Sequence, residues 1–253
     1  MSAALLSVRD LCVKFGGLTA LDKVALELHE NEVVGLIGPN GAGKTTLFNA
    51  ISGLVAGTGS IEITGKLSSW PKPHELINLG IARTLQGVGL FPEMTVLENV
   101  MVGATKFAKA GLIRSALGLD KKAEVELQEL ALAALAKVSC GDIANEKVSS
   151  LPYPVTKRVA IARALISEPK ILLLDEPAGG LGAEDIEWLN GFIKAISRKS
   201  SVLIVEHHMD VVMSVCDRIY VLDFGQVIAS GKPTEVRNNP AVVAAYLGNS
   251  AVK

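Results

Sequence analysis

The sequence predicts an α/β protein whose core is a parallel sheet covered by helices. Three continuous apolar runs lie in the C-terminal half of the chain: "ILLL" at 171–174, "VLIV" at 202–205 and "IYVL" at 219–222. Runs that are apolar throughout, rather than alternating, suit strands that are buried on both faces, as parallel strands are. Segments with helical spacing separate these runs, and strand–helix–strand alternation is typical of α/β folds.

The N-terminal part of the chain predicts further strands and one helix. "LLSVRDLCVKF" and "KVALEL" are strand-like, and Val33–Ile37 is a short apolar run that enters a glycine-rich loop. "TTLFNAIS", which follows that loop, has helical spacing. Ile61–Ile63 is another strand candidate, and the segment after it, "TGKLSSWPKP", has the composition of turns.

The middle of the chain predicts an inserted helical subdomain. Residues 121–138, "KKAEVELQELALAALAKV", form the longest helical stretch, and they are rich in the good helix formers Ala, Leu, Glu and Lys. The whole segment 88–156 lacks the long apolar runs found further on. We therefore expect a single domain whose α/β core comprises residues 1–87 and 157–253.

Composition excludes several classes of protein. The net charge of −1 argues against a general nucleic-acid-binding surface. The three cysteines, Cys12, Cys140 and Cys216, form no CxxC pair, so we expect reduced, buried thiols rather than a zinc site or a disulfide framework. The N-terminus resembles no signal peptide and no apolar run is long enough to span a membrane, which predicts a soluble chain inside the cell.

A phosphate-binding loop is the most specific motif. "GPNGAGKTT" matches GxxxxGK[ST] between a predicted strand and a predicted helix. The glycines let successive backbone N–H groups point at phosphates, and the helix N-terminus adds its positive end. Lys44 is expected to reach the β- and γ-phosphates, and Thr45 to place its hydroxyl on Mg²⁺. The expected phosphate-binding residues are Gly38, Pro39, Asn40, Gly41, Ala42, Gly43, Lys44, Thr45 and Thr46.

Charged residues end two of the predicted buried strands. "ILLLDEP" places Asp175, a candidate Mg²⁺ aspartate, before Glu176, a candidate general base. "VLIVEHH" ends with His207 and His208, at the edge where open α/β sheets bind ligands. Taken alone, an acidic pair at a strand end also fits a solvated loop start, and either histidine also fits an ordinary surface residue.

Taken in this order, these stretches resemble the ATP-binding cassette (ABC) family over essentially the whole chain. "GLTALDKVALELHENEVVGLIGPNGAGKTTLFNAISG", "GIARTLQGVGLFPEMTVLENVMVG" and "DRIYVLDFGQVIASGKPTEV" with "AAYLG" are especially similar to the ATPase subunits of branched-chain (hydrophobic) amino acid importers. The resemblance implies the ABC ATPase fold: a P-loop core with a parallel sheet, an N-terminal antiparallel β subdomain and an inserted helical subdomain. It also implies hydrolysis of ATP with Mg²⁺, coupled to import of branched-chain or related small hydrophobic amino acids or amides.

The resemblance also implies roles for individual residues. Phe15, in "VKFGG", matches the aromatic that stacks on adenine, with a core phenylalanine as the alternative. Gln86, in "RTLQGV", matches the residue that senses Mg²⁺ and water, and residues 87–102 match the groove that receives a helix of the membrane subunit. The Mg²⁺ aspartate, the catalytic glutamate and the histidine that contacts the γ-phosphate are matched by Asp175, Glu176 and His207.

One segment departs from the family pattern. "LPYPV", residues 151–155, stands where the family has its signature, LSGGQ or LPYGQ, which closes over the ATP of a partner cassette. Proline occupies the serine position and the second glycine position, Pro152 and Pro154, and proline cannot donate a backbone N–H. The glutamine position is Val155, and a position that is usually Asp or Asn in the next loop is Gly182. We expect a degraded signature beside a different cassette, although Tyr153 or Thr156 could supply the donor instead.

The implied partners are a second cassette, integral membrane permease subunits and, indirectly, an extracytoplasmic solute-binding protein, at the cytoplasmic face of the membrane and without nucleic acid. Two alternatives stay open. One is the ATPase of a lipid or lipopolysaccharide export machine of the same branch. The other is an ABC ATPase that acts on nucleic acid or ribosomes, for which we see no basic surface and no long coiled-coil insertion.

Overall fold

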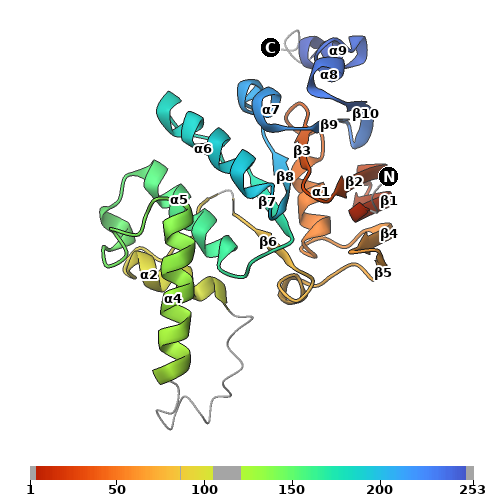
Figure 1. Ribbon diagram of the computed structural model, residues 1–253. Coiled ribbons are helices and arrows are strands. Elements are labelled where there is room, and N and C mark those ends of the chain that lie inside the picture. The colour runs from red at the N-terminus through yellow and green to blue at the C-terminus, as the bar shows by residue number, and fades with distance from the viewer. Residues whose placement is uncertain (1–3, 86, 105–120, 249–253) are drawn as a thin grey trace.

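The protein consists of two β-sheets, with one helix between them and the other helices beside the larger sheet (Figure 1). The computed structural model describes residues 4–85, 87–104 and 121–248 of the 253-residue chain. This arrangement is the α/β fold that the apolar runs predict, with an antiparallel N-terminal sheet and a largely parallel second sheet.

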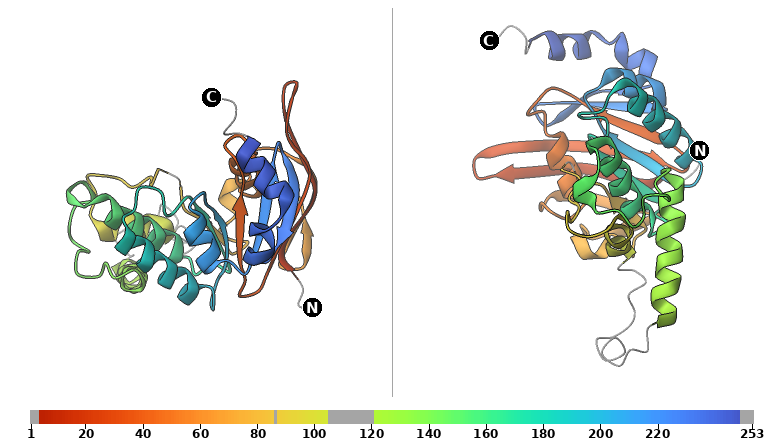
Figure 2. Two further views of the ribbon diagram at one scale, coloured as in Figure 1. Left: turned by 90° about the horizontal axis from the view of Figure 1, so that it is seen from above. Right: turned by 90° about the vertical axis from the view of Figure 1, so that its left-hand side faces the viewer.

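The smaller sheet is antiparallel and has the strand order β2-β1-β4-β5. Its strands are β1 (Ala4–Phe15), β2 (Leu18–His29), β4 (Thr58–Ile63) and β5 (Lys66–Ser68). β1 and β2 form a long hairpin that extends beyond the rest of the sheet (Figure 2). The strands expected from "LLSVRDLCVKF", "KVALEL" and Ile61–Ile63 are therefore confirmed.

The expectation that all of "TGKLSSWPKP" forms turns is wrong at Lys66–Ser68. Thr64 and Gly65 adopt left-handed φ values of 52° and 73° and make the turn. The chain then folds back as β5, which pairs with β4 from Ile63 opposite Lys66. Pairing with β4 outweighs the weak strand preference of these three residues.

The larger sheet has six strands in the order β10-β9-β3-β8-β7-β6, and all neighbours except β9 and β10 are parallel. Its strands are β3 (Val33–Ile37), β6 (Ile81–Arg83), β7 (Ile171–Asp175), β8 (Ser201–Val205), β9 (Arg218–Asp223) and β10 (Gln226–Gly231). Every residue of β3, β7 and β8 is buried, which confirms the interpretation of the apolar runs.

Most of the helices lie on one side of the larger sheet (Figures 1 and 2). The α-helices are α1 (Lys44–Ile51), α2 (Val96–Met101), α4 (Lys121–Lys137), α5 (Tyr153–Leu165), α6 (Ala183–Ile196), α7 (Met209–Val215), α8 (Pro233–Arg237) and α9 (Pro240–Gly248). The 3₁₀ turns in the described ranges are η1 (Pro73–Glu75), η2 (Val102–Ala104) and η3 (Val148–Ser150).

The helices α2, α4 and α5 contact one another and form the helical part of the molecule. α4 confirms the long helix expected at 121–138, and in Figure 2 it projects away from the sheets. α5 begins at Tyr153 and continues to Leu165, so one helix runs from the segment expected to be inserted into the segment expected to be core. The division at residues 88 and 156 stays a prediction.

The two faces of the larger sheet pack against different layers of the molecule. In β7, Ile171 and Leu173 pack into the cluster shared with α1 and the antiparallel sheet, whereas Leu172 and Leu174 pack into the cluster shared with the outer helices. Both faces are apolar, so the sheet is held between α1 and the outer helix layer. The carboxyl ends of β3, β7 and β8 therefore meet at one edge, beside the start of α1.

The cysteines largely agree with the expectation of reduced, buried thiols. All three cysteines are free thiols, and Cys140 and Cys216 are buried, but Cys12 is only partly buried because it lies near the end of β1. Burial raises the pKa of the Cys216 thiol to about 12. In the described ranges, no helix combines the length and the apolar character needed to cross a membrane.

Leu173→Ala tests the importance of the buried central strands. Leu173 is fully buried between the two sheets, so truncation should lower the free energy of unfolding by about 2–5 kcal/mol through lost apolar burial and a residual cavity. Urea denaturation followed by circular dichroism measures this change. The control Leu67→Ala removes a side chain that is 72% exposed and should change stability by less than about 0.5 kcal/mol. Equal effects of the two substitutions would contradict the assignment of this core.

Candidate active site

The phosphate-binding loop joins β3 to α1 in a conformation that requires glycine. Gly38 has a φ of 151°, and a Cβ at that position would lie 2.1 Å from the carbonyl oxygen of Leu222. Gly43 has a φ of 104° and is the N-cap residue of α1. Side chains at these two positions would be strained or would clash, so the loop can adopt this path only with glycine. The N-terminus of α1 thus opens directly into the loop.

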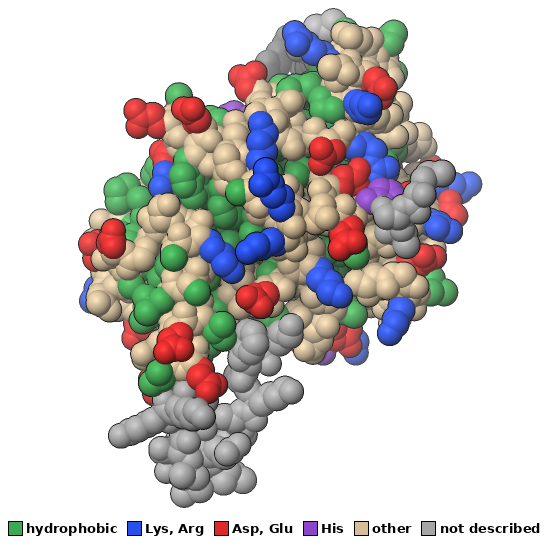
Figure 3. Space-filling model, in the orientation of Figure 1, with side chains coloured by type: hydrophobic (Ala, Val, Ile, Leu, Met, Phe, Trp, Pro, Cys, Tyr) green, Lys and Arg blue, Asp and Glu red, His purple; other side chains and the backbone are tan. Residues whose placement is uncertain are grey.

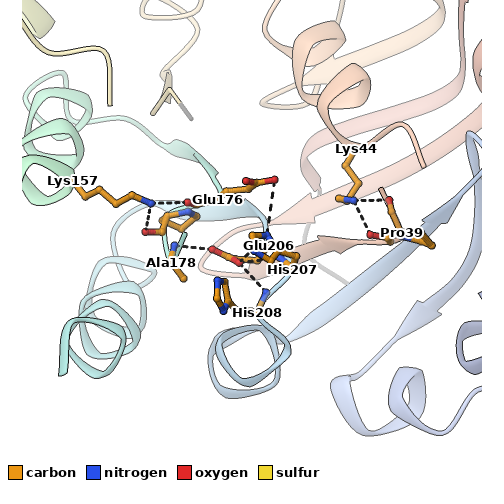
Figure 4. Close-up of polar contacts among 10 residues, drawn as sticks. Pro39, Lys44, Lys157, Glu176, Ala178, Glu206, His207 and His208 are labelled. Atoms are coloured by element: carbon orange, nitrogen blue, oxygen red, sulfur yellow. Dashed lines mark hydrogen bonds and ion pairs between the residues drawn. The ribbon is translucent and has the colours of Figure 1, made fainter. Parts of the chain in front are cut away.

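The Lys44 side chain is hydrogen-bonded to the backbone of this loop. Its Nζ donates hydrogen bonds to the carbonyl oxygens of Gly38 at 2.7 Å and Pro39 at 2.8 Å (Figure 4). Burial lowers the pKa of the Lys44 ammonium below its ordinary value, and the charge of Glu176 opposes this shift. The ammonium is therefore held inside the loop, where phosphate oxygens could replace the two carbonyl oxygens as its acceptors.

One open pocket brings the loop together with residues from both sheets. It is lined by residues 40–46 of the loop, by Phe15 from β1, and by Glu176. Phe15 is 50% exposed, so it is available to a ligand and is not a core side chain. Phe224, which is 82% exposed in the turn between β9 and β10, lines the same pocket and was not expected from the sequence.

The acidic pair lies where β7 ends. Asp175 is the last residue of the strand and is buried, and its Oδ2 accepts a hydrogen bond from Arg83 at 2.7 Å. Glu176 follows with a φ of 47°, a value that non-glycine residues rarely adopt, and its N–H donates to the Val205 carbonyl at 2.9 Å. Such strain persists where the surroundings enforce it, and it is common at active sites.

His207 lies beside Glu176, with 4.0 Å between the histidine Nδ1 and the glutamate Oε1 (Figure 4). A second pocket is lined by the loop residues 38–40 together with Glu176, His207 and Tyr246. The structure thus brings together the predicted loop, glutamate and histidine. Tyr246, from the C-terminal helix α9, was missed because it follows the loop by some two hundred residues.

Glu206 is a fully buried carboxylate that the sequence analysis did not single out. Its Oε1 accepts the N–H of Ala178 at 2.7 Å, and its Oε2 accepts the N–H groups of His207 at 2.9 Å and His208 at 3.0 Å (Figure 4). These bonds tie the end of β8 to the segment that follows Glu176. A charged residue directly after the apolar run "VLIV" was the available signal.

Lys157 connects α5 to the same segment. Its Nζ donates to the carbonyl oxygens of Glu176 at 2.9 Å and Pro177 at 3.0 Å (Figure 4). Burial lowers the pKa of Lys157, against the opposing charges of Glu206 and Glu176. The position of the segment at Glu176 and Pro177 therefore depends on α5, the helix that begins within "LPYPV". Gln86, the remaining expected site residue, lies outside the described residues.

The prolines of "LPYPV" fit the start of α5. Pro152 is the N-cap residue, with a φ of −61°, and Pro154 lies in the first turn, where backbone N–H groups have no partner within the helix. The N–H groups of Val155 and Thr156 donate to the Pro152 carbonyl at 3.0 and 3.1 Å. The Thr156 hydroxyl donates to the Tyr153 carbonyl at 2.7 Å. The two prolines are therefore compatible with the start of a helix. They also leave the N-terminus of α5 without the backbone N–H groups of residues 152 and 154.

A phosphate-binding loop between a strand and a helix, with an acidic pair at the end of a neighbouring parallel strand, defines a P-loop nucleoside triphosphatase. Residues 21–179 match the family described as "ABC transporter", and residues 226–252 match the one described as "Branched-chain amino acid ATP-binding cassette transporter". The chain belongs to the ATP-binding subunits of ABC transporters, which are ATPases, and the expected resemblance is confirmed.

Individual relatives support this assignment over the full length. The high-affinity branched-chain amino acid transport ATP-binding protein LivG of Salmonella typhimurium is 40% identical over 255 residues, which cover 99% of this chain and 100% of LivG. The crystal structure of the ADP conformation of MJ1267, an ATP-binding cassette of an ABC transporter, is 30% identical with a TM-score of 0.84, over 98% of this chain and 100% of that one. A dimeric post-hydrolysis structure of the cassette MJ0796 bound to ADP and Pi is 29% identical with a TM-score of 0.75, over 90% and 98%.

Two substitutions separate nucleotide binding from hydrolysis. Lys44→Ala removes the ammonium from the loop and should abolish binding of ATP·Mg²⁺. Glu176→Gln keeps the shape of the side chain but removes the carboxylate expected to act as general base, so it should bind ATP and lose roughly 10²–10⁴-fold in turnover. Titration with a fluorescent ATP analogue measures binding, and phosphate release by the assembled complex measures turnover. Equal ATP affinity in wild type and Lys44→Ala, or turnover by Glu176→Gln within about threefold of wild type, would contradict these roles.

Proposed function

We propose that this chain hydrolyses ATP at the cytoplasmic face of a membrane to drive the import of branched-chain or related small hydrophobic amino acids or amides. The observation that carries the proposal is the full-length similarity to LivG, together with the separate match of the C-terminal segment 226–252. The P-loop pocket supports the ATPase part independently, because it combines the loop, an exposed aromatic and a carboxylate in one place.

The proposed reaction is transfer of the γ-phosphoryl group of ATP to water. Oxygen atoms are the ligands that Mg²⁺ prefers, and the Thr45 hydroxyl at the start of α1 and the Asp175 carboxylate at the end of β7 would supply them. The ion would neutralise charge on the phosphates, as the Lys44 ammonium does. Glu176 would orient and deprotonate the attacking water, and His207, which lies beside Glu176 in the same pocket, would hold the γ-phosphate. Gln86 is proposed to sense Mg²⁺ and the water.

A groove beside α5 fits a helix of a membrane subunit. It is lined by residues of η1, β6 and α5 and by Leu85, Phe91 and Val102, which are 50%, 50% and 41% exposed. Arg163 shapes its wall by donating to the carbonyls of Val88 at 2.9 Å and Gly89 at 2.6 Å. Hydrophobic side chains also gather toward the left of Figure 3, on the face that the helical part of the molecule forms. We propose that the permease contacts this groove, which lies where the proposed helical subdomain 88–156 meets the proposed core.

The second partner is proposed to be a different cassette that has an intact signature. α5 presents Pro152 and Pro154 at its N-terminus, where the family presents hydrogen-bond donors, and the Thr156 hydroxyl is engaged within its own turn. Gly182, the N-cap residue of α6, makes no side-chain cap. Both departures lie on the surface offered to a partner, whereas this chain's own phosphate-binding loop is intact.

Uptake by the assembled transporter tests the proposed function. The chain should co-purify with membrane subunits encoded beside it and, in proteoliposomes with ATP inside and a solute-binding protein outside, should accumulate labelled leucine. Glu176→Gln in this chain should reduce the accumulation by at least about tenfold. ATP-dependent extraction of lipid or lipopolysaccharide without leucine uptake would favour the exporter alternative, and co-purification with ribosomes alone would refute the transport role.

A mixed pair of cassettes predicts unequal ATP sites. The partner's signature closes over this chain's intact loop, whereas "LPYPV" closes over the partner's loop without the N–H of residue 154. Loss of one hydrogen bond to a charged group costs roughly 1.5–3 kcal/mol, or about 10–150-fold in rate if it acts only in the transition state. Lys44→Ala here should therefore remove most of the ATPase activity, and the matching change in the partner much less. Equal losses, with brisk hydrolysis by this chain alone, would show that the prolines are harmless.

A further inference from the structure

Arg83 occupies a position next to the proposed metal-binding carboxylate that neither the motifs nor the comparisons assign a role. It is the last residue of β6, and its guanidinium donates to Oδ2 of Asp175 at 2.7 Å. The side chains of Arg83 and Asp175 are only 10% and 3% exposed. A buried pair of this kind is screened little by solvent, so the charge of Arg83 acts strongly on the carboxylate.

The guanidinium is fixed from a second side by α1, the helix that follows the phosphate-binding loop. Its other terminal nitrogen donates to Oδ1 of Asn49 at 2.8 Å and to Oγ of Ser52 at 3.0 Å. It also lies over the ring of Phe48, with 5.5 Å between the guanidinium carbon and the ring centroid. Arg83 therefore bridges the loop helix and the acidic strand, and it has little freedom to swing away from Asp175.

The residue after Arg83 holds the backbone of the same aspartate. The Asp175 N–H donates to Oγ1 of Thr84 at 3.2 Å, while Arg83 holds the carboxylate. Two consecutive residues of one strand end thus position both the main chain and the side chain of Asp175. Arg83 engages one carboxylate oxygen, Oδ2, which leaves the carboxylate a second oxygen with which to serve an ion.

We propose that Arg83 is a positioning residue that orients Asp175 for catalysis and at the same time weakens the affinity of the site for Mg²⁺. The inference rests on the proposed function, because it takes Asp175 as the Mg²⁺ aspartate. A fixed cation on the carboxylate lowers the negative charge that the ion meets, since like charges in a buried site repel. The same contact holds the carboxylate in one orientation, which a hydrated Mg²⁺ with strict octahedral geometry requires.

This dual role predicts opposite changes in two measured quantities. The first quantity is measured in the Glu176→Gln background, where ATP is expected to bind without being hydrolysed. Binding of a fluorescent ATP analogue is followed as free Mg²⁺ is raised, and this gives the Mg²⁺ concentration at half-maximal binding. Arg83→Gln should lower that concentration by about threefold or more, because a positive charge is removed. At saturating Mg²⁺, the assembled transporter carrying Arg83→Gln should lose about tenfold or more in kcat, because the carboxylate is no longer oriented.

The conservative variant separates charge from geometry. Arg83→Lys keeps the positive charge but cannot reach Asp175 and the two α1 acceptors together, so the half-saturating Mg²⁺ concentration should stay within about twofold while kcat falls. The control Arg198→Gln removes an exposed arginine and should change neither quantity. If Arg83→Gln does not fold, as judged by circular dichroism, Arg83→Lys decides alone: a wild-type kcat would overturn the proposal.

Asp175→Asn distinguishes failure of this inference from failure of the proposed Mg²⁺ site. If Asp175→Asn changes the Mg²⁺ dependence and Arg83→Gln leaves it unchanged or raises the half-saturating concentration, Arg83 does not tune the ion and the inference is wrong. If Asp175→Asn itself leaves the Mg²⁺ dependence unchanged, the assignment of Asp175 falls, and the inference falls with it. A lower half-saturating concentration together with a lower kcat supports it.

Discussion

The register of three buried parallel strands is the constraint on which the whole site depends. Leu36 of β3 pairs with Val205 of β8, and Val205 pairs with Asp175 of β7, so the three strands end at the same level. The residues that follow them, the phosphate-binding loop, Glu176 and Glu206, therefore leave the sheet side by side. A shift of one strand by one residue would move each buried side chain to the opposite face, where the neighbouring side chains differ in shape. Close packing on both faces thus favours the alignment that brings these residues together.

Beyond the strand ends, buried charges hold the segment around Glu176. Glu206 accepts three backbone N–H groups and Lys157 donates to two backbone carbonyls, so the main chain around Glu176 is fixed from two sides. Buried charges are tolerated only where such bonds compensate the loss of hydration. Because these bonds go to the backbone, they determine the path of the chain at Glu176 and leave its carboxylate to face the pocket. The unusual φ of Glu176 follows from this framework.

The parts of the site that could be predicted from the sequence are those whose chemistry is local in the chain. The phosphate-binding loop is a run of nine residues with a fixed spacing, and Asp175 and Glu176 directly follow an apolar strand. Arg83 could not be found in this way, because its partner lies 92 residues away and three residues of β6 carry too little strand signal. Tyr246 and Phe224 could not be predicted either, because they come from the C-terminal segment, far along the chain from the other residues that line the pockets. β5 and β10 were missed because their strand character comes from pairing with neighbours.

The prolines at the start of α5 are compatible with the stability of the chain but change the hydrogen-bond donors on its surface. Within the chain they fit well, because Pro152 precedes the helix and Pro154 lies where no intrahelical donor is needed. Arg158 of the same helix donates to Asp185 in the first turn of α6 at 2.8 Å, so a hydrogen bond joins the N-terminal parts of the two helices. That surface carries both departures from the family pattern, the prolines and Gly182. The fold of this chain does not require N–H donors at these positions. Their loss should therefore affect a molecule that binds this surface. This is why the effect is expected at a partner's ATP site and not in the folding of this protein.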